Sequence, residues 1–391
     1  MHRHPVSTGP PRFDVADVVR AHRHELERQH PLGPAEARVL SAIALCRTPA
    51  LGGHREVCRS CGHESAAYNS CRNRHCPKCQ ALAQERWIAS RAERLLPVRH
   101  FHVVFTLPSE LRTLCRSAPR AMYDALFEVA TATLLELAMS RWHALPGITA
   151  VLHTWTRELH LHPHLHLLVT AGGLHLWKDR WVHRKRFLFR LEMMAQVYRA
   201  KMLEALRALH REGVFQRHPD SQDPEAFGRR LAAAGRHKWV VYTKEPFRRA
   251  DFVLRYLGRY THRVAISNSR LLDVTPAAVT FRTRGTDAVT LPPVEFLRRF
   301  VQHVLPDGLH KIRHYGLYAG ANAETRWVRA RELLSADEKA PAQAAVALSE
   351  QVSPSWQERL LALTGRDVRT CPLCGGVMDK LALARAPPAA A

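Results

Sequence analysis

The sequence has no apolar run long enough to cross a membrane. No hydrophobic stretch reaches the roughly 18 residues that a spanning helix needs, and Met1 to Pro5 have no apolar signal core. Acidic side chains are also scarce, with 35 Asp and Glu against 58 Lys and Arg. We therefore expect a cytoplasmic protein that does not use a membrane.

The shortage of carboxylates has a second consequence. No cluster of Asp and Glu lies near the motifs described below, which argues against a nuclease that holds two metal ions with carboxylates. The formal charge of +23 and the pI near 10.4 favour a polyanionic partner, with nucleic acid as the first candidate. The 391 residues are 46% hydrophobic, enough for two or three domains with a full core.

Cysteine is concentrated in one place. Five of the nine cysteines lie within residues 58–79, which in a reducing compartment favours zinc over disulfides. Two Cys-x2-Cys pairs separated by 14 residues predict one tetrahedral structural zinc. Its expected ligands are Cys58, Cys61, Cys76 and Cys79. Cys71 is a further candidate ligand, and a second ion held with Cys46 and His54 is the alternative.

A third Cys-x2-Cys pair, Cys371 and Cys374, lies near the C-terminus. It is one half of a zinc site. Either a histidine such as His310 or His314 completes it, or another chain does, or it binds nothing. The sequence leaves these three readings open.

The stretch His162-Pro-His-Leu-His-Leu-Leu-Val169 predicts a strand. Because a strand alternates its faces with a period of two, His164 and His166 share one face and the leucines share the other. Two neutral imidazoles held side by side form a metal site. The alternative is a surface strand in a chain with 25 histidines.

Residues 246–263 predict an amphipathic helix. Tyr256 and Tyr260 are one turn apart and share a face, and a separate basic stripe is formed by Arg255, Arg259 and Arg263. Tyrosines in this position most often pack in a core. Close to a metal-bound phosphodiester, however, a phenol can attack phosphorus and form a covalent intermediate.

The order of predicted strands and helices after residue 98 favours an α+β fold, with helices packed on one face of a sheet and the other face free for a ligand. We expect three parts. Residues 1–98 form a small zinc-binding domain with a connecting helix, residues 99–325 form the main sheet domain, and residues 326–391 form a linker and tail.

Together these motifs resemble the IS ninety-one family of insertion-sequence transposases. The similarity runs from about Cys46 to about Gly320, with the motifs in the family's order. It is carried by Cys58-x2-Cys61-Gly-His, Tyr68-Asn-Ser-Cys71-Arg-Asn-Arg-His-Cys76-Pro-Lys-Cys79-Gln80, Val103-Val-Phe-Thr-Leu-Pro108, the pair His164 and His166, and Tyr256-Leu-Gly-Arg-Tyr260-Thr-His-Arg263.

The resemblance implies a ferredoxin-like, antiparallel single-strand endonuclease of the histidine-hydrophobic-histidine type. It implies that His164 and His166 hold Mg²⁺ or Mn²⁺ and that Tyr256 and Tyr260 are the nucleophiles of a rolling-circle transposase. The implied partners are single-stranded ends of the element and target DNA at the bacterial nucleoid. Arg255, Arg259 and Arg263 are expected to contact that DNA.

Two readings compete with this one. A plasmid replication initiator or relaxase would use the same chemistry, and a zinc-containing DNA-binding protein would bind DNA without cleaving it. The third ligand of the divalent ion is also open. Its candidates are His153, Glu158, His160, His162 and His262.

Overall fold

The structure is a computed structural model that describes residues 12–184, 188–247, 258, 264–336, 355–365 and 367–383. The helices in these ranges are α1 (Val15–Gln29), α2 (Pro34–Leu45), α3 (Ala81–Ala92), α4 (Arg112–Ser117), α5 (Pro119–Trp142), α6 (Leu191–Arg211), α7 (Pro224–Arg236), α9 (Pro293–Val301), α10 (Arg326–Ser335) and α11 (Trp356–Thr364). The strands are β1 (Gly53–Cys58), β2 (Glu64–Tyr68), β3 (His100–Thr106), β4 (Ala144–Leu145), β5 (Gly147–Trp155), β6 (Leu161–Thr170), β7 (Gly172–His175), β8 (Trp181–His183), β9 (Val241–Phe247), β10 (Leu271–Val274), β11 (Val279–Arg282), β12 (Ala288–Leu291), β13 (Ile312–Gly316) and β14 (Met378–Leu383).

The central sheet has the strand order β13-β5-β6-β3-β9, and every neighbouring pair is antiparallel. In chain order, β3 is followed by α4 and α5, then β5 and β6, then α6 and α7, then β9. This is the β-α-β-β-α-β arrangement of a ferredoxin-like unit, with β13 added at one edge. The predicted α+β class and the antiparallel sheet are therefore confirmed.

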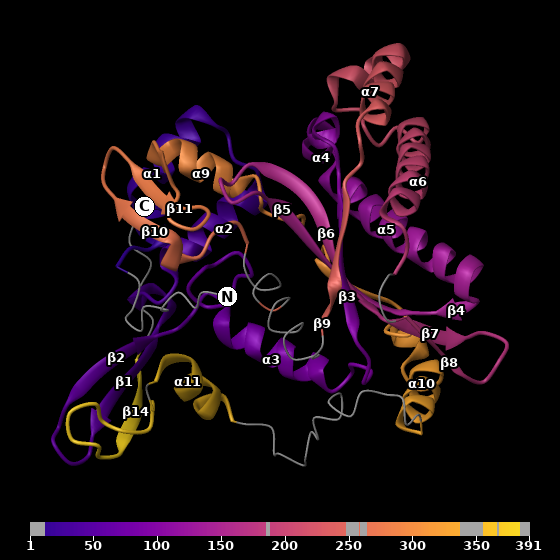
Figure 1. Ribbon diagram of the computed structural model, residues 1–391. Coiled ribbons are helices and arrows are strands. Elements are labelled where there is room, and N and C mark those ends of the chain that lie inside the picture. Colours follow the sequence, from indigo (N-terminus) through magenta and orange to yellow (C-terminus); the bar gives the residue numbers. More distant parts are fainter. Residues whose placement is uncertain are drawn as a thin grey trace.

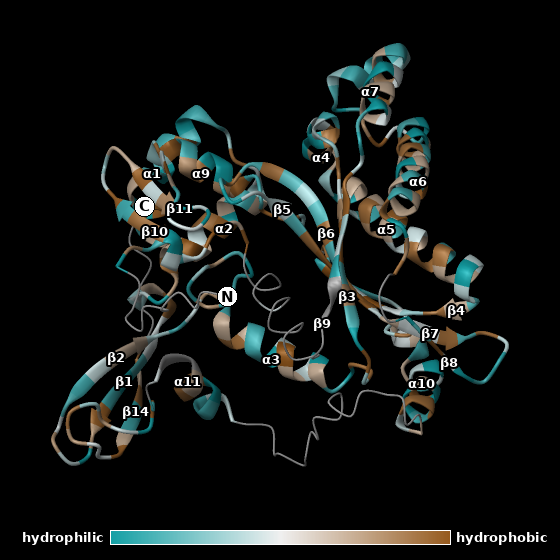
Figure 2. Cartoon of the chain, viewed as in Figure 1, coloured by the Kyte–Doolittle hydropathy of each residue, from teal (hydrophilic) through white to brown (hydrophobic). Residues whose placement is uncertain are grey.

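One face of the sheet is covered by helices, as predicted (Figure 1). Leu165, Leu167 and Val169 of β6 belong to the main hydrophobic core, together with residues of α5 and α6. Hydrophobic residues, brown in Figure 2, recur along both helices between hydrophilic ones, so each helix turns an apolar stripe towards the sheet. This packing fixes which face of β6 points away from the core.

The opposite face is not wholly free, contrary to the prediction. At one end, Trp87 and Leu95, from α3 and the segment after it, pack on Val151 and Leu168. The sequence predicted this segment only as a connecting helix, and an amphipathic pattern does not show which surface the apolar side covers. What stays uncovered by α3 is the end of the face that carries His164 and His166.

A second hydrophobic core joins segments that are far apart in the chain. It combines α1 and α2 with the small sheet β10-β11-β12 and with α9. A buried hydrogen bond from the backbone N–H of Val15 to Asn268 Oδ1, 3.2 Å long, ties the start of α1 to the segment before β10. The N-terminal helices therefore pack with part of the expected middle domain.

The expected tail also returns to the N-terminal part. Strand β14 pairs with β1 in antiparallel register, and the resulting sheet has the order β14-β1-β2. Figure 1 shows this small sheet apart from the central one, with α11 beside α3. Segments from all three expected parts thus pack with one another, and the boundaries at residues 98 and 325 stay a prediction.

Within the described residues, no helix is both long and apolar enough to span a bilayer.

Candidate metal centres

The first cysteine cluster lies between α2 and α3. It contains Cys46, Cys71, Cys76 and Cys79, whose sulfur atoms all lie within 4.8 Å of one another. Cys71 Sγ and Cys79 Sγ are 3.8 Å apart. In a tetrahedral zinc site with Zn–S bonds of about 2.3 Å, ligand sulfurs are about 3.8 Å apart. The cluster therefore has the dimensions of a closed structural site.

The second cysteine cluster lies at the far end of the β1-β2 hairpin. It contains Cys58, Cys61, Cys371 and Cys374, again within 4.8 Å of one another. The backbone N–H of Cys61, helped by that of Ser60, lowers the pKa of the Cys58 thiol to about 6. Such a shift favours the thiolate, which is the form that binds metal.

The predicted single site of Cys58, Cys61, Cys76 and Cys79 is therefore wrong. The hairpin is the physical reason: Cys58 lies at its tip, whereas Arg47 N–H donates to Asn69 O (3.0 Å) at its base. A strand of six residues spans about 20 Å, so one ion cannot reach both ends. The two Cys-x2-Cys pairs belong to different clusters.

The histidines named as zinc alternatives have other partners. His54 Nε2 lies 3.2 Å from Glu56 Oε1. His314 contacts Arg91 Nη1 (3.0 Å) and Thr149 Oγ1 (3.1 Å). Among the described residues, none of these histidines lies in either cysteine cluster.

A third cluster lies on the central sheet and consists of His153, His164 and His166. His153 of β5 pairs with His164 of β6 in the antiparallel register. The three possible ligand nitrogens lie within 4.8 Å of one another. Among the candidates for a third ligand that the structure describes, His153 is thus the one grouped with the pair.

Two contacts orient the rings of this cluster. His164 Nδ1 donates to the carbonyl oxygen of His162 (2.6 Å), which leaves Nε2 as its metal-binding atom. His102 Nε2 lies 2.8 Å from His166 Nδ1, and the two rings stack with an interplanar angle of 5°. Such secondary contacts fix the tautomer and orientation of a metal ligand.

His102 was missed by the sequence reasoning. It lies on β3, which pairs with β6, and it precedes His166 by 64 positions in the sequence. The only signal available was the alternation His100-Phe-His102, which puts both histidines on the same face of the strand as the pair on β6.

Burial keeps these histidines neutral. It lowers the pKa of His164 and His102 to about 4, and it lowers the pKa of His153 and His166 well below the usual value. The unprotonated imidazole is the form that coordinates a metal ion. The cluster can therefore bind a cation at neutral pH without first losing protons.

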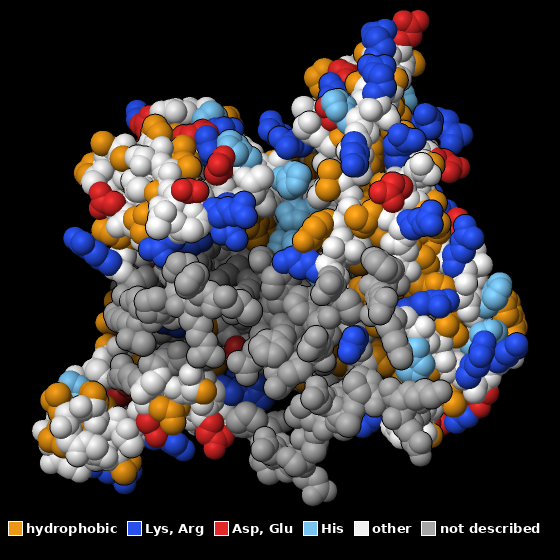
Figure 3. Space-filling model, viewed as in Figure 1, with side chains coloured by type: hydrophobic (Ala, Val, Ile, Leu, Met, Phe, Trp, Pro, Cys, Tyr) orange, Lys and Arg blue, Asp and Glu red, His pale blue; other side chains and the backbone are white. Residues whose placement is uncertain are grey.

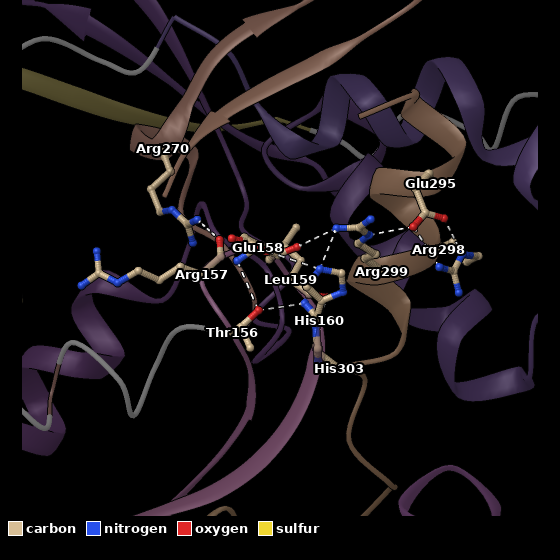
Figure 4. A network of polar contacts seen from close by, with 10 residues as sticks. All are labelled: Thr156, Arg157, Glu158, Leu159, His160, Arg270, Glu295, Arg298, Arg299 and His303. Carbon is tan, nitrogen blue, oxygen red and sulfur yellow. Dashed lines mark hydrogen bonds and ion pairs between the residues drawn. The ribbon is translucent and has the colours of Figure 1, made fainter. Parts of the chain in front are cut away.

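The turn between β5 and β6 is held from both sides (Figure 4). Arg299 of α9 donates to Glu158 O (3.1 Å), and His303 Nε2 donates to Leu159 O (3.1 Å). From the other side, Arg270 donates to the carbonyl oxygen of Arg157. Since β5 and β6 carry the three histidines, these bonds help to fix the site.

A cleft of about 620 Å³ opens over the histidines. Figure 3 shows histidine side chains gathered in a hollow between the lobe with α9 and the helices α4 and α5. None of the described residues that line the cleft is acidic, and its cations are Arg157, Arg270 and Arg282. Burial lowers the pKa of Arg270 only to about 10, so it stays charged at neutral pH. The cleft suits an anionic ligand.

The expected nucleophiles and basic stripe lie outside the described residues. These are Tyr256, Tyr260, Arg255, Arg259 and Arg263, and the same holds for His262. Gly258 between the tyrosines is described and buried. A Cβ at this position would lie 2.5 Å from Ile88 Cδ1 of α3, so Gly258 packs closely on that helix.

Family comparisons define the class of protein. Residues 147–326 match a family model described as "Putative transposase", and residues 18–107 match one described as "Transposase zinc-binding domain". The chain is a transposase with a zinc-binding domain in its N-terminal part. That domain and the cysteine clusters together support structural zinc.

Two relatives extend the similarity over most of the chain. The "Putative transposase y4qJ" of Sinorhizobium fredii is 40% identical over 374 residues, which cover 92% of each protein. The "Transposase for insertion sequence element IS801" of Pseudomonas savastanoi pv. phaseolicola is 31% identical over 326 residues, 81% of this chain and 78% of the relative. The chain belongs to the IS ninety-one family of insertion-sequence transposases. No solved structure matches it.

The buried histidines predict a loss of stability in acid. Burial lowers the pKa of His303 to about 4 from its ordinary value of 6.5, so the unfolded state binds the proton more readily than the folded state. Stability is therefore lost as the pH falls below 6.5. Between pH 7 and pH 5 this histidine alone should remove about 2 kcal/mol from the free energy of unfolding.

Denaturant unfolding of the wild type and of His303→Gln at pH 7 and pH 5 measures this loss. The variant is expected to be less stable at pH 7 but to lose about 2 kcal/mol less on acidification. Equal losses in the two proteins would show that His303 is not buried in its neutral form.

Proposed function

We propose that this transposase cleaves and rejoins single-stranded DNA through a 5′-phosphotyrosine intermediate, in rolling-circle transposition of its insertion element. One observation carries the proposal: three neutral histidines lie together under a basic cleft in a chain of this family. A phosphodiester in the cleft would meet arginines along its walls and a metal site at its floor.

The residues present fit a divalent ion. His153, His164 and His166 supply three nitrogen ligands, which suit Mn²⁺ better than Mg²⁺ because Mg²⁺ prefers oxygen. A divalent ion held there would polarise a non-bridging oxygen of the scissile phosphate. His102 and the carbonyl oxygen of His162 keep two of the three imidazoles oriented towards it.

We propose Tyr256 and Tyr260 as the nucleophiles, on the strength of the family resemblance. The phenolic oxygen forms a bond to phosphorus, and the 3′ oxygen of the preceding nucleotide leaves and takes up a proton. The reverse attack by a 3′-hydroxyl on the phosphotyrosine rejoins the strand. The energy of the phosphodiester is conserved in the intermediate, so no ATP is needed.

We propose that the DNA backbone follows the arginines. Arg157, Arg270 and Arg282 line the cleft at the histidines, and we keep Arg255, Arg259 and Arg263 as expected contacts. Guanidinium groups pair well with phosphate oxygens. The formal charge of +23 adds a general attraction for the polyanion.

A replication initiator or relaxase would share this chemistry, but the matched transposase families favour transposition. A non-enzymatic DNA-binding protein would have no use for three buried neutral histidines beside a basic cleft. It would bind labelled single strands and leave them intact, so a cleavage assay separates the two readings.

Removing the metal ligands should abolish cleavage. We expect His164→Ala with His166→Ala to cut single-stranded DNA from the ends of the element at least 100-fold more slowly in Mn²⁺, because metal chemistry of this kind supplies several kcal/mol. DNA affinity should be largely retained, since it arises mainly from phosphate contacts. Gel analysis of labelled strands measures both.

Two controls sharpen this test. Replacing the exposed His24 and its neighbour His22 on α1 by Ala removes the same number of imidazoles and should leave cleavage unchanged. His102→Ala should weaken Mn²⁺ binding about 10–100-fold and be rescued by more Mn²⁺, as expected of a positioning residue. Full cleavage by the double variant would refute the metal site.

The covalent product should be carried by Tyr256 or Tyr260. Each single Tyr→Phe change removes one hydroxyl with little effect on packing, so we expect partial cleavage or the loss of one of two strand transfers. The double Phe variant should form no protein–DNA adduct. Peptide mapping of a trapped adduct is the measurement, and an adduct on any other residue would contradict this assignment.

The basic stripe should set part of the salt dependence of binding. Replacing Arg255, Arg259 and Arg263 by Gln should flatten the slope of log affinity against log salt by roughly 0.7 for each lost phosphate contact. The matched control replaces the exposed Arg199, Arg207 and Arg211 of α6, on the helix-covered side of the sheet. Equal slopes in both variants would mean that the stripe does not touch DNA.

A further inference from the structure

The second cysteine cluster joins the two ends of the chain. Cys58 Sγ lies 3.4 Å from Cys374 Sγ, and Cys61 Sγ lies 3.7 Å from Cys371 Sγ. The members of the second pair are 310 positions apart in the sequence. The matched zinc-binding family covers only residues 18–107 and so contains no more than half of these ligands.

The two halves of the cluster have the same local structure. Each is a Cys-x2-Cys-Gly turn in which the glycine N–H donates to the carbonyl oxygen of the first cysteine, at 3.1 Å for Gly62 and 2.9 Å for Gly375. Both glycines have positive φ, 69° and 74°, a backbone conformation that few other residues adopt. The same turn therefore occurs twice, at two positions that are far apart in the sequence.

Backbone N–H groups point at the sulfurs in both turns. Ser60 N–H donates to Cys58 Sγ (3.4 Å), Leu373 N–H donates to Cys371 Sγ (3.5 Å), and Gly376 N–H donates to Cys374 Sγ (3.4 Å). Hydrogen bonds to sulfur stabilise thiolates, the form that binds zinc. All four sulfurs lie too far apart for the disulfide length of about 2.05 Å.

We propose that Cys58, Cys61, Cys371 and Cys374 bind a second zinc ion, separate from the one expected at the first cluster, and that this ion fastens the C-terminal strand β14 to the N-terminal hairpin. Four thiolates in two facing turns complete a tetrahedral structural site with no open position. The C-terminal pair thereby finds its other half within the same chain.

The surroundings of the cluster explain why a metal is needed there. The hydrophobic core beside it consists of Cys58, Cys371 and Met378 alone among the described residues. Such a small core cannot hold a three-stranded sheet together, and structural zinc commonly supplies the missing free energy. The ion pair of Arg59 with Asp379, at 2.6–2.9 Å, is exposed and adds little.

The turns also fit each other closely. A Cβ on Gly376 would lie 2.5 Å from Ser60 Oγ and 3.1 Å from Cys58 Sγ, so only glycine lets the C-terminal turn approach the N-terminal one this closely. Arg59 N–H further donates to Val377 O (3.1 Å). The two turns are shaped for contact within one chain.

The fastening has a consequence for the catalytic part. The C-terminal segment that ends at the cluster includes α11, and α11 contacts α3. Helix α3 in turn contacts both the central sheet, through Trp87, and Gly258. The second zinc ion therefore helps to hold α11 against α3, the helix on which Gly258 packs.

The test is a count of zinc in the purified full-length protein under reducing conditions, by elemental mass spectrometry. We expect two ions per chain in the wild type and one in Cys371→Ser with Cys374→Ser. The matched variant Cys76→Ser with Cys79→Ser should also keep one. Cys115→Ser, which changes a cysteine of the main core outside both clusters, should keep two.

One zinc ion in the wild type, or two in the Cys371/Cys374 variant, would overturn the proposal. A disulfide in this cluster would also overturn it. Such a bond would lower the mass of the peptides that contain these cysteines by two hydrogens, and a reductant would restore the mass. If the serine variant fails to fold, Cys374→His gives a second test, because histidine can replace a cysteine ligand. This variant should keep two ions and release one of them to chelator at least 10-fold faster.

Discussion

The alternation of side chains along β6 is the constraint on which the rest of the molecule depends. Leu165, Leu167 and Val169 are fully or almost fully buried against the helices, and each contributes about 1.5–3 kcal/mol through burial. A shift of register by one residue would turn these side chains away from the core and push His164 and His166 into it. The same packing that makes the sheet stable therefore fixes where the imidazoles point.

Neighbouring strands turn this pair into a site. Because β5 and β3 lie on either side of β6, His153 and His102 approach from opposite directions, one as the proposed third ligand and the other as a partner of His166. The turn after β5 also accepts a hydrogen bond from Arg299 of α9, a helix that belongs to the second core. The geometry at the histidines thus draws on both hydrophobic cores.

The sequence was informative where a local period decides the structure. It predicted the faces of β6 and the α+β class, both of which follow from the spacing of apolar residues. It failed where distant segments meet. The grouping of the cysteines depends on the length of a hairpin and on a strand from the other end of the chain, and neither leaves a local signal. His102 and the cover that α3 gives the sheet were missed for the same reason. The expected tyrosine helix falls outside the described residues.

The pairing of β1 with β14 also bears on how the protein is made. Translation delivers β1 well before its partner strand, which leaves the ribosome about 15–60 s later at 5–20 residues per second. During that interval one edge of β1 and the thiols of Cys58 and Cys61 have no partner from the C-terminal segment, a state that favours aggregation or capture by chaperones. A polypeptide released before Cys374 can never complete this sheet. Only chains that contain β14 therefore reach the closed arrangement, so a segment synthesised much later decides whether the sheet begun by β1 is finished.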